Sequence, residues 1–199
     1  MKRILHLISS PRGDESYSIQ LANAIITKLQ EQYPGSIVEE ANLIEINVPH
    51  LDTAHLRSFF TPAEQLTAED QDAIRYSDAA IAQLMAADVI VIGAPLYNFG
   101  IHSALKAWID HIARAGKTFS YSEQGAEGLV KGKKVYVAMS SGAVYSEGFY
   151  QAYDFVSTYL KAVLGFLGMT DLKLFRVEGV NIPGLKEHAL DKAIESISL

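Results

Sequence analysis

The sequence contains no cysteine, so disulfides, thiolate metal sites and cysteine nucleophiles are all excluded. It also lacks a concentrated basic segment, because 17 Lys and Arg are set against 23 Asp and Glu, for a net charge of −6 at pH 7. This balance argues against nucleic acid or an anionic membrane as the main partner. No apolar run approaches the roughly 20 residues that a membrane-spanning helix needs. The first apolar run, residues 4–8, is shorter than a signal-peptide core. We therefore expect a cytoplasmic protein.

Several motifs of nucleotide and ester chemistry are missing as well. There is no G-x-x-x-x-G-K-[ST] loop for a triphosphate and no G-x-G-x-x-G loop for a dinucleotide, so a mononucleotide fits better than ATP or a tightly held NAD. The G-x-S-x-G block of ester hydrolases is absent too. The only Asp-x-x-His spacing, Asp52 to His55, precedes the third predicted strand instead of lying near the C-terminus. His102 and His111 are nine residues apart rather than four, so we expect no metal site.

Short apolar runs alternate along the chain with segments of helical period. Five strands separated by helices indicate a parallel sheet covered on both faces. We expect a single domain of residues 1–199 with an α/β fold of the flavodoxin type, a doubly wound five-stranded sheet in the order 2-1-3-4-5. The predicted strands are residues 4–8, 37–43, 89–93, 134–139 and 172–177.

The helices of this fold are predicted from apolar stripes and capping signals. Glu69, Asp70 and Asp72 are expected to form the solvated start of the second helix, where acidic groups complement the helix dipole. Two connections, residues 44–65 and 118–132, are longer than the fold requires and are expected to cover a ligand or a partner. The apolar stripes comprise Ala22, Ile25, Ile26, Leu29 and Tyr33; then Ile74, Ile81, Leu84 and Met85; then Leu105, Trp108, Ile109 and Ile112; the last two helices are residues 154–167 and 185–197.

Ligands of open parallel sheets bind beyond the carboxyl ends of the strands. The first such loop, SSPRGDESYS, carries four serine hydroxyls and Arg12 and leads into a helix N-terminus, where backbone N–H groups favour an anion. This composition suits a terminal phosphate monoester, with Asp14 and Glu15 turned away from it. The alternative is that Ser16 or Ser18 simply caps the helix.

The loops after the third and fourth strands, APLYNFGIHS and SSGAVYSEG, should converge on the first. The former offers aromatic rings and an amide, and the latter a turn of small residues with free N–H groups. Together they favour a flavin, whose flat ring needs apolar cover and hydrogen bonds at its polar edge. Tyr145, Tyr150 and Tyr153 either line a pocket or pack together. His6 is expected to be a packed, hydrogen-bonded core histidine.

Read together, these motifs resemble a known family over essentially the whole chain. SSPRG with serines at 16 and 18, AP-x-YNF-x-I, LK-x-W-x-D, RAG-x-TF-x-Y and G-x-EGL-x-x-GKK are similar to the FMN-dependent NADH:quinone oxidoreductases, also called azoreductases. The resemblance implies bound FMN, NADH as co-substrate, and quinones and aromatic azo compounds as acceptors. It also implies a homodimer with the flavin near the interface, where Phe59 and Phe60 either cover the partner's site or pack within their own subunit.

The resemblance also assigns roles to residues of this sequence. The chemistry takes place on the flavin, so no catalytic side chain is implied. Tyr121 and Phe166 are candidates for lining the substrate space. FMN contacts are implied for Ser10, Ser16, Tyr17 and Ser18 at the phosphate, for Leu96, Tyr97, Asn98 and Phe99 at the ring, and for Ser140, Ser141, Gly142 and Ala143 in the third loop.

One departure from the family concerns the third loop. The family usually shows Ser-Arg-Gly-Gly where this chain has Ser140-Ser141-Gly142-Ala143. The loss of the arginine removes a cation near the flavin, with consequences for its potential and for substrate preference. Two other functions remain open: a flavodoxin-like electron carrier and an NAD(P)H-dependent reductase that releases FMN.

Overall fold

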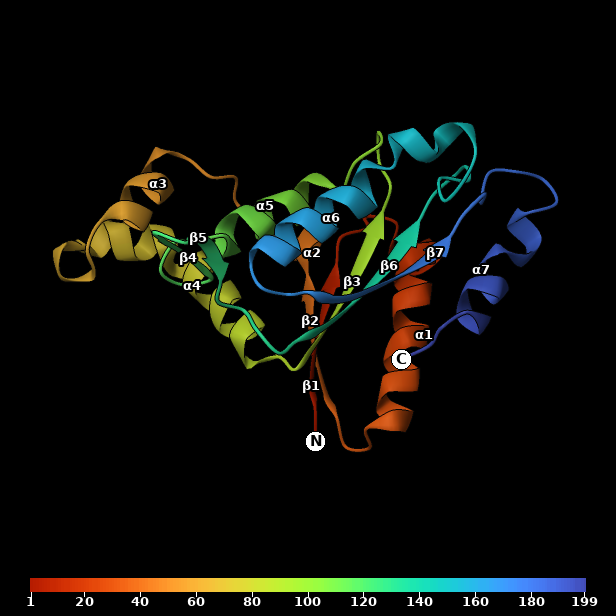
Figure 1. Ribbon diagram of the computed structural model, residues 1–199, viewed down its shortest axis with the longest axis horizontal. Coiled ribbons are helices and arrows are strands. Elements are labelled where there is room, and N and C mark those ends of the chain that lie inside the picture. Colours follow the sequence, from red (N-terminus) through yellow and green to blue (C-terminus); the bar gives the residue numbers. More distant parts are fainter.

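The computed structural model describes residues 1–199, and its centre is a five-stranded parallel sheet (Figure 1). The strands lie in the order β2-β1-β3-β6-β7, so the chain reverses its direction of winding between β1 and β3. Their carboxyl ends all lie at one edge, because every neighbouring pair is parallel. The strands are β1 Arg3–Ile8, β2 Ile37–Asn42, β3 Val89–Pro95, β6 Lys134–Ser140 and β7 Asp171–Val177.

Helices cover both faces of the sheet and create two apolar cores. Helices α1 (Tyr17–Gln32) and α7 (Lys186–Glu195) cover one face, and α4 (Ala68–Ala86), α5 (Ser103–Ile112) and α6 (Phe155–Phe166) cover the other (Figure 1). All seven residues of β3 are buried, as expected for a strand covered on both faces. The predicted α/β fold with a five-stranded parallel sheet is therefore confirmed. No helix has both the length and the apolar character needed to cross a membrane.

The predicted apolar stripes pack into the two cores, where Tyr33 is partly buried, with Met85 as the exception. Ile74, Ile81 and Leu84 of α4 lie in the core, but Met85 is 45% exposed. Met85 follows Leu84 directly and therefore points about 100° away from it around the helix, beyond the face that the sheet covers. Its assignment to the core was wrong.

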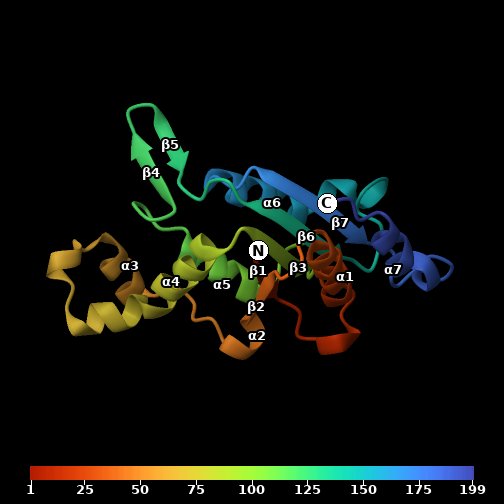
Figure 2. The same cartoon turned by 90° about the horizontal axis from the view of Figure 1, so that it is seen from below.

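The two long connections contain elements that the sequence analysis did not predict. Residues 44–65 include the end of α2 (Leu43–Ile46) together with α3 (Thr53–Phe60) and a 3₁₀ turn at Ala63–Gln65. Residues 118–132 include an antiparallel hairpin of β4 (Phe119–Ser122) and β5 (Gly125–Gly128). Figure 2 shows this hairpin standing away from the rest of the molecule. Five strands form the main sheet and two form this separate hairpin.

Asp70 is buried, so the expectation that it belongs to a solvated helix start was wrong. Arg57 of α3 donates to Asp70 Oδ1 from Nη2 at 2.7 Å and from Nε at 3.0 Å. Thr67 and Asp70 also form the capping box of α4. These contacts hold the pKa of Asp70 far below its ordinary value, with the Thr67 hydroxyl contributing most and Arg57 next. The carboxylate thereby fastens α3 to α4.

Two histidines are fully buried in the cores. His6 is packed as expected, but neither ring nitrogen makes a hydrogen bond, and Nδ1 lies 3.6 Å from Glu40 Oε1. His111 Nε2 donates to the carbonyl oxygen of Pro49 at 2.9 Å, while its Nδ1 has no partner. His55 and Tyr76 pack against the His111 ring. Burial lowers the pKa of both His6 and His111.

These histidines predict that the protein loses stability in mildly acidic solution. The unfolded chain binds protons more readily than the folded protein, so the free energy of unfolding should fall as the pH drops through about 6.5. We expect His111→Gln, whose amide can still donate to Pro49, to show a shallower fall between pH 7.5 and 5 in urea titrations. The exposed His188→Gln serves as control and should retain the slope of the original protein. Equal slopes for all three proteins would contradict this account.

Candidate functional site

The serines of the first loop have different roles. Ser9 Oγ donates to the Gly93 carbonyl at 2.6 Å and joins the ends of β1 and β3, so this hydroxyl is committed to the fold. Ser10, Ser16 and Ser18 are also buried, and Ser10 and Ser16 line a cavity at the edge of the sheet. Ser16 Oγ and Ser18 Oγ lie 3.0 Å apart. Three polar groups are thus gathered at the start of α1.

Ser16 occupies the N-cap position of α1 but does not cap the helix. Its side chain makes no capping hydrogen bond, whereas Asp52, Thr67 and Asp154 all accept backbone N–H groups at their own helix starts. The expectation of a simple capping serine therefore fails for Ser16. A helix start whose first N–H groups are unpaired and whose N-cap hydroxyl does not cap them favours an anion such as a phosphate monoester.

The loop after β3 is a tight turn in a conformation that few residues adopt. Tyr97 and Gly100 exchange two backbone hydrogen bonds of 2.9 Å, and the residues between them, Asn98 and Phe99, have φ of 47° and 68°. A left-handed conformation is tolerated by asparagine but is strained for phenylalanine. The turn leaves the Asn98 and Phe99 N–H groups without acceptors in the protein and presents the Tyr97 and Phe99 rings at the edge of the sheet.

The loop after β6 is tied to the loop after β7. Backbone N–H groups of Gly179, Val180 and Asn181 donate to the carbonyls of Ala143, Ser141 and Gly142. Ser141 Oγ donates to the Ala143 carbonyl at 2.8 Å and closes the turn. The N–H groups of Gly142 and Ala143 stay unpaired, so they are available as donors.

These loops enclose a small polar cavity of about 260 Å³ at the switch point of the sheet. Most of its lining residues were predicted from the sequence, but Val180 and Asn181, in the loop after β7, were not. Both residues follow the carboxyl end of a strand, the same signal that identified the other loops. The lining residues are Ser10, Arg12, Ser16, Tyr17, Pro95, Leu96, Tyr97, Ser140, Ser141, Gly142, Val180 and Asn181.

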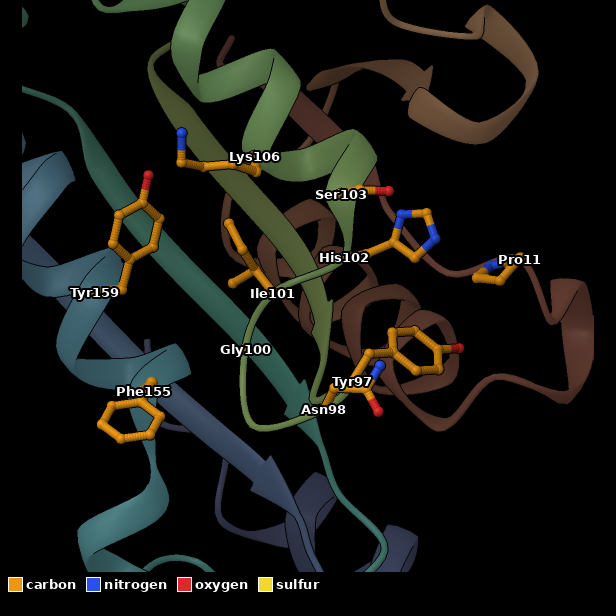
Figure 3. Close-up of a pocket in the computed structure, with 10 residues that line it drawn as sticks. All are labelled: Pro11, Tyr97, Asn98, Gly100, Ile101, His102, Ser103, Lys106, Phe155 and Tyr159. Atoms are coloured by element: carbon orange, nitrogen blue, oxygen red, sulfur yellow. The ribbon is translucent and has the colours of Figure 1, made fainter. Parts of the chain in front are cut away.

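A second cavity of about 800 Å³ adjoins the first, with Tyr97 in the lining of both. In Figure 3, Phe155 and Tyr159 of α6 lie at one end and Pro11 lies at the other, with the start of α5 between them. His102 Nδ1 accepts the Ala104 N–H at 3.1 Å, and burial lowers the His102 pKa. The imidazole is therefore neutral, and this cavity has mostly apolar walls. It was not predicted as a separate space.

The structure does not bring every candidate residue to these cavities. Tyr121 and Phe166 both pack around Phe119, with ring centroids 5.5 and 4.7 Å away. Phe166 ends α6 and Phe155 begins it, so about 16 Å of helix separates the two. Within one chain, Tyr121 and Phe166 therefore lie far from the cofactor loops.

The remaining aromatic candidates form clusters of their own. Tyr145, Tyr150 and Tyr153 gather with Phe149 beside Phe99, outside the lining of both cavities. Phe59 packs within its own chain, where the Arg114 guanidinium lies 4.6 Å from its ring centroid, whereas Phe60 is 80% exposed. Asp14 and Glu15 are exposed and do not line the small cavity.

The arrangement defines a flavodoxin-like protein, and comparison with known sequences agrees. A sequence model described as "Flavodoxin-like fold" matches residues 2–198. Related proteins named FMN-dependent NADH:quinone oxidoreductase include one from Paraburkholderia phymatum, 50% identical over 100% of this chain and 99% of the relative. Another, from Herminiimonas arsenicoxydans, is 49% identical over 90% of this chain and 88% of the relative. The chain belongs to this family of FMN-dependent oxidoreductases, as the sequence motifs indicated.

Solved structures extend the comparison to azoreductases. An azoreductase from Bacillus anthracis str. Sterne superposes with a TM-score of 0.91 at 30% identity, covering 98% of this chain and 96% of that one. An FMN-dependent NADH-azoreductase from Bacillus anthracis str. Ames Ancestor, solved in complex with FMN, has a TM-score of 0.85 at 29% identity and covers 98% and 97% of the two chains. Both cover nearly the whole of each chain, hairpin and long connections included.

We call the loop after β3, residues 96–101, the ring loop, and its left-handed turn at Asn98 and Phe99 yields a test of the site geometry. Replacing Asn98 by Ala places a Cβ-bearing residue with no compensating side chain at φ 47°, which should lower the free energy of unfolding by about 1 kcal/mol. Asn98→Gly should change it by less than about 0.5 kcal/mol, because glycine adopts this conformation freely. Urea unfolding of both variants checks the difference. If Ala is as stable as Gly at this position, the turn does not have this geometry in solution.

Proposed function

We propose that residues 1–199 act as one FMN-binding domain that uses NADH to reduce quinones by two electrons and to cleave aromatic azo compounds. The observation that carries the proposal is the unused N-cap of α1 beside a cavity with apolar, aromatic walls. A phosphate group suits the former and a flat ring suits the latter. Both features meet at Tyr97, which lines the two cavities.

The residues at the small cavity fit the phosphate end of FMN. Ser10, Ser16 and Ser18 would donate from their hydroxyls, and the backbone of Tyr17 and Ser18 would donate from the helix start. Hydrogen bonds to an ionised group contribute about 1.5–3 kcal/mol each. Arg12 is the only cationic side chain in the lining and would supply the positive charge.

The residues at the ring end fit a flavin. Leu96, Tyr97 and Phe99 would supply apolar cover, while Asn98, with Ser140, Ser141, Gly142 and Ala143, would face the polar edge. The unpaired N–H groups of Gly142 and Ala143 would stabilise negative charge on the reduced ring. The Ser141 hydroxyl donates to the Ala143 carbonyl, so it cannot take the place of the arginine that the family usually has here. We therefore expect the negative charge of the reduced ring to be less stabilised in this protein than in relatives that have the arginine.

FMN, when bound, supplies a ring that accepts a hydride and then returns two electrons to an acceptor. The protein's own contribution is position and environment. The apolar walls of the larger cavity would hold NADH and later a quinone or azo compound against the same face, one after the other, in a ping-pong cycle. The aromatic surroundings would keep water away from the reacting face. Such a cycle requires no side-chain acid or base, because the chemistry takes place on the flavin. We place the activity in the cytoplasm, where NADH is available.

We also propose that the protein is a homodimer in which each chain completes its partner's site. Tyr121, Phe60 and Phe149 are at least 72% exposed, an unusual amount of aromatic surface for a monomer. Tyr121 lies outside its own chain's cavities, and a two-fold axis could bring it to those of a second copy.

Turnover and FMN binding test the function. Purified protein should bind FMN, oxidise NADH faster when benzoquinone is present, and give parallel double-reciprocal plots. Ser16→Ala and Ser18→Ala should each raise the Kd for FMN by about 10-fold or more, through loss of a hydrogen bond to a charged group. Ser196→Ala, which removes only a bond to the Ala193 carbonyl near the C-terminus, should leave the Kd unchanged.

The possible negative results distinguish the alternative functions from one another. Protein that takes up no FMN would refute the proposal. A yellow protein inert to NADH would be an electron carrier, and one that releases reduced FMN into solution would be a flavin reductase.

Sedimentation tests the homodimer. We expect a particle of twice the 21.8 kDa chain mass. Tyr121→Ala should raise the quinone KM about fivefold although Tyr121 is remote from its own cavity. A monomer that turns over quinone at full rate would contradict the shared site.

A further inference from the structure

A surface segment beside the larger cavity is rich in exposed aromatic side chains. We call residues 145–155 the aromatic segment; it contains Tyr145, Phe149, Tyr150, Tyr153 and Phe155. Tyr153 lies 5.6 Å from Phe99 of the ring loop, and Phe155 lines the cavity itself. Phe149, which precedes both of them in the segment, is 79% exposed. The segment has only one short 3₁₀ turn, Phe149–Tyr153, so its position needs another explanation.

Its N-terminal end is held by one carboxylate. Glu178 Oε1 accepts the backbone N–H of Tyr145 at 2.7 Å and that of Ser146 at 2.9 Å. Glu178 follows the last residue of β7, and its side chain is only 12% exposed. Two N–H groups on one buried carboxylate oxygen fix the direction in which the chain leaves the loop after β6.

Its C-terminal end is held by an arginine of the same strand. Arg176 Nη2 lies 2.6 Å from Asp154 Oδ2, and Asp154 accepts the Ser157 N–H at the start of α6. Arg176 Nη1 also lies 3.5 Å from Glu178 Oε1. The bonds from Ser157 and Arg176 outweigh burial and lower the Asp154 pKa. Arg176 and Glu178, the β7 clamp, therefore hold both ends of the aromatic segment from one strand end.

The energetics of buried ion pairs favour a positioning role for the β7 clamp over a stabilising one. Burying an ion pair is often no better for stability than burying apolar groups of the same size, so such pairs are weak evidence for a stabilising role. In this protein the Arg176 ion pairs fix a segment whose aromatic side chains are exposed. Fixing exposed side chains adds little stability unless another molecule packs against them.

We propose that Arg176 and Glu178 are positioning residues that hold the aromatic segment as a wall for the flat acceptor. The proposal rests on the function proposed above and assigns it two residues outside both cavities. Neither side chain lines the cavities, so each acts through Phe155, which lines the larger cavity, and through Tyr153, which packs against Phe99. Loss of the clamp should weaken capture of the acceptor while FMN remains bound through the loops after β1, β3 and β6.

The test compares Glu178→Ala, Glu178→Gln and Asp88→Asn in the FMN-loaded protein. Asp88 is the matched control, because it accepts a backbone N–H from Arg3 and pairs with Lys2 at the opposite edge of the sheet. Glu178→Ala should raise the benzoquinone KM about tenfold, with kcat and the Kd for FMN within about twofold of the original. Glu178→Gln keeps an oxygen for the two N–H groups and should raise KM about threefold. Asp88→Asn should leave KM unchanged.

Chymotrypsin provides a readout that does not depend on turnover. Cleavage after Phe149 or Tyr150 should be several-fold faster in Glu178→Ala than in the original protein or in Asp88→Asn. Unchanged cleavage, or faster cleavage with an unchanged KM, would overturn the positioning role alone. If Glu178→Ala does not fold, the KM of Glu178→Gln decides: a threefold rise supports the role and no change overturns it. Original protein that fails to oxidise NADH would instead overturn the proposed function, and this inference with it.

Discussion

The hydrogen bond from Ser9 Oγ to the Gly93 carbonyl lies where the whole site begins. It joins the ends of β1 and β3, the two strands between which the order of the sheet reverses. A crevice opens at such a point because the connections on either side run to opposite faces of the sheet. The start of α1 and the Tyr97 turn both depend on these two strand ends being held together. The bond is buried, so water would not readily replace it if the Ser9 hydroxyl were removed.

Much of the fold could be predicted, because local patterns determined it. The three central strands are apolar runs that are almost fully buried, and α1 carries a regular apolar stripe ended by Pro34-Gly35. The hairpin of β4 and β5 escaped prediction, since its strands are four residues long and contain exposed polar residues and glycine. Helix α3 escaped because its capping box has His55 in place of the usual Glu or Gln. Both elements are stabilised by contacts distant in the sequence.

The loops that form the site could be predicted from the sequence, but the role of each residue in those loops could not. Ser9 and Ser10 are adjacent and chemically identical, yet one is committed to the sheet and the other lines the cavity; only the direction of each side chain separates them. The burial of Asp70 could not be predicted either, because its partner Arg57 is 13 residues away on another helix. Val180 and Asn181 were missed for a topological reason. The switch point draws attention to β1 and β3, whereas the hydrogen bonds that tie the β7 loop to Gly142 appear only in three dimensions.

Ion pairs to a buried carboxylate recur where this chain must place irregular backbone. Asp70 with Arg57 fixes the long connection before α4, and Asp154 with Arg176 fixes the start of α6. Apolar packing is nondirectional and would leave such segments free to shift, whereas an arginine fork and a carboxylate define distance and angle together. In a family whose chemistry resides in the cofactor, the protein contributes by placing groups around it. These two pairs therefore fix connections, whereas the strands of the sheet are fixed by their own register.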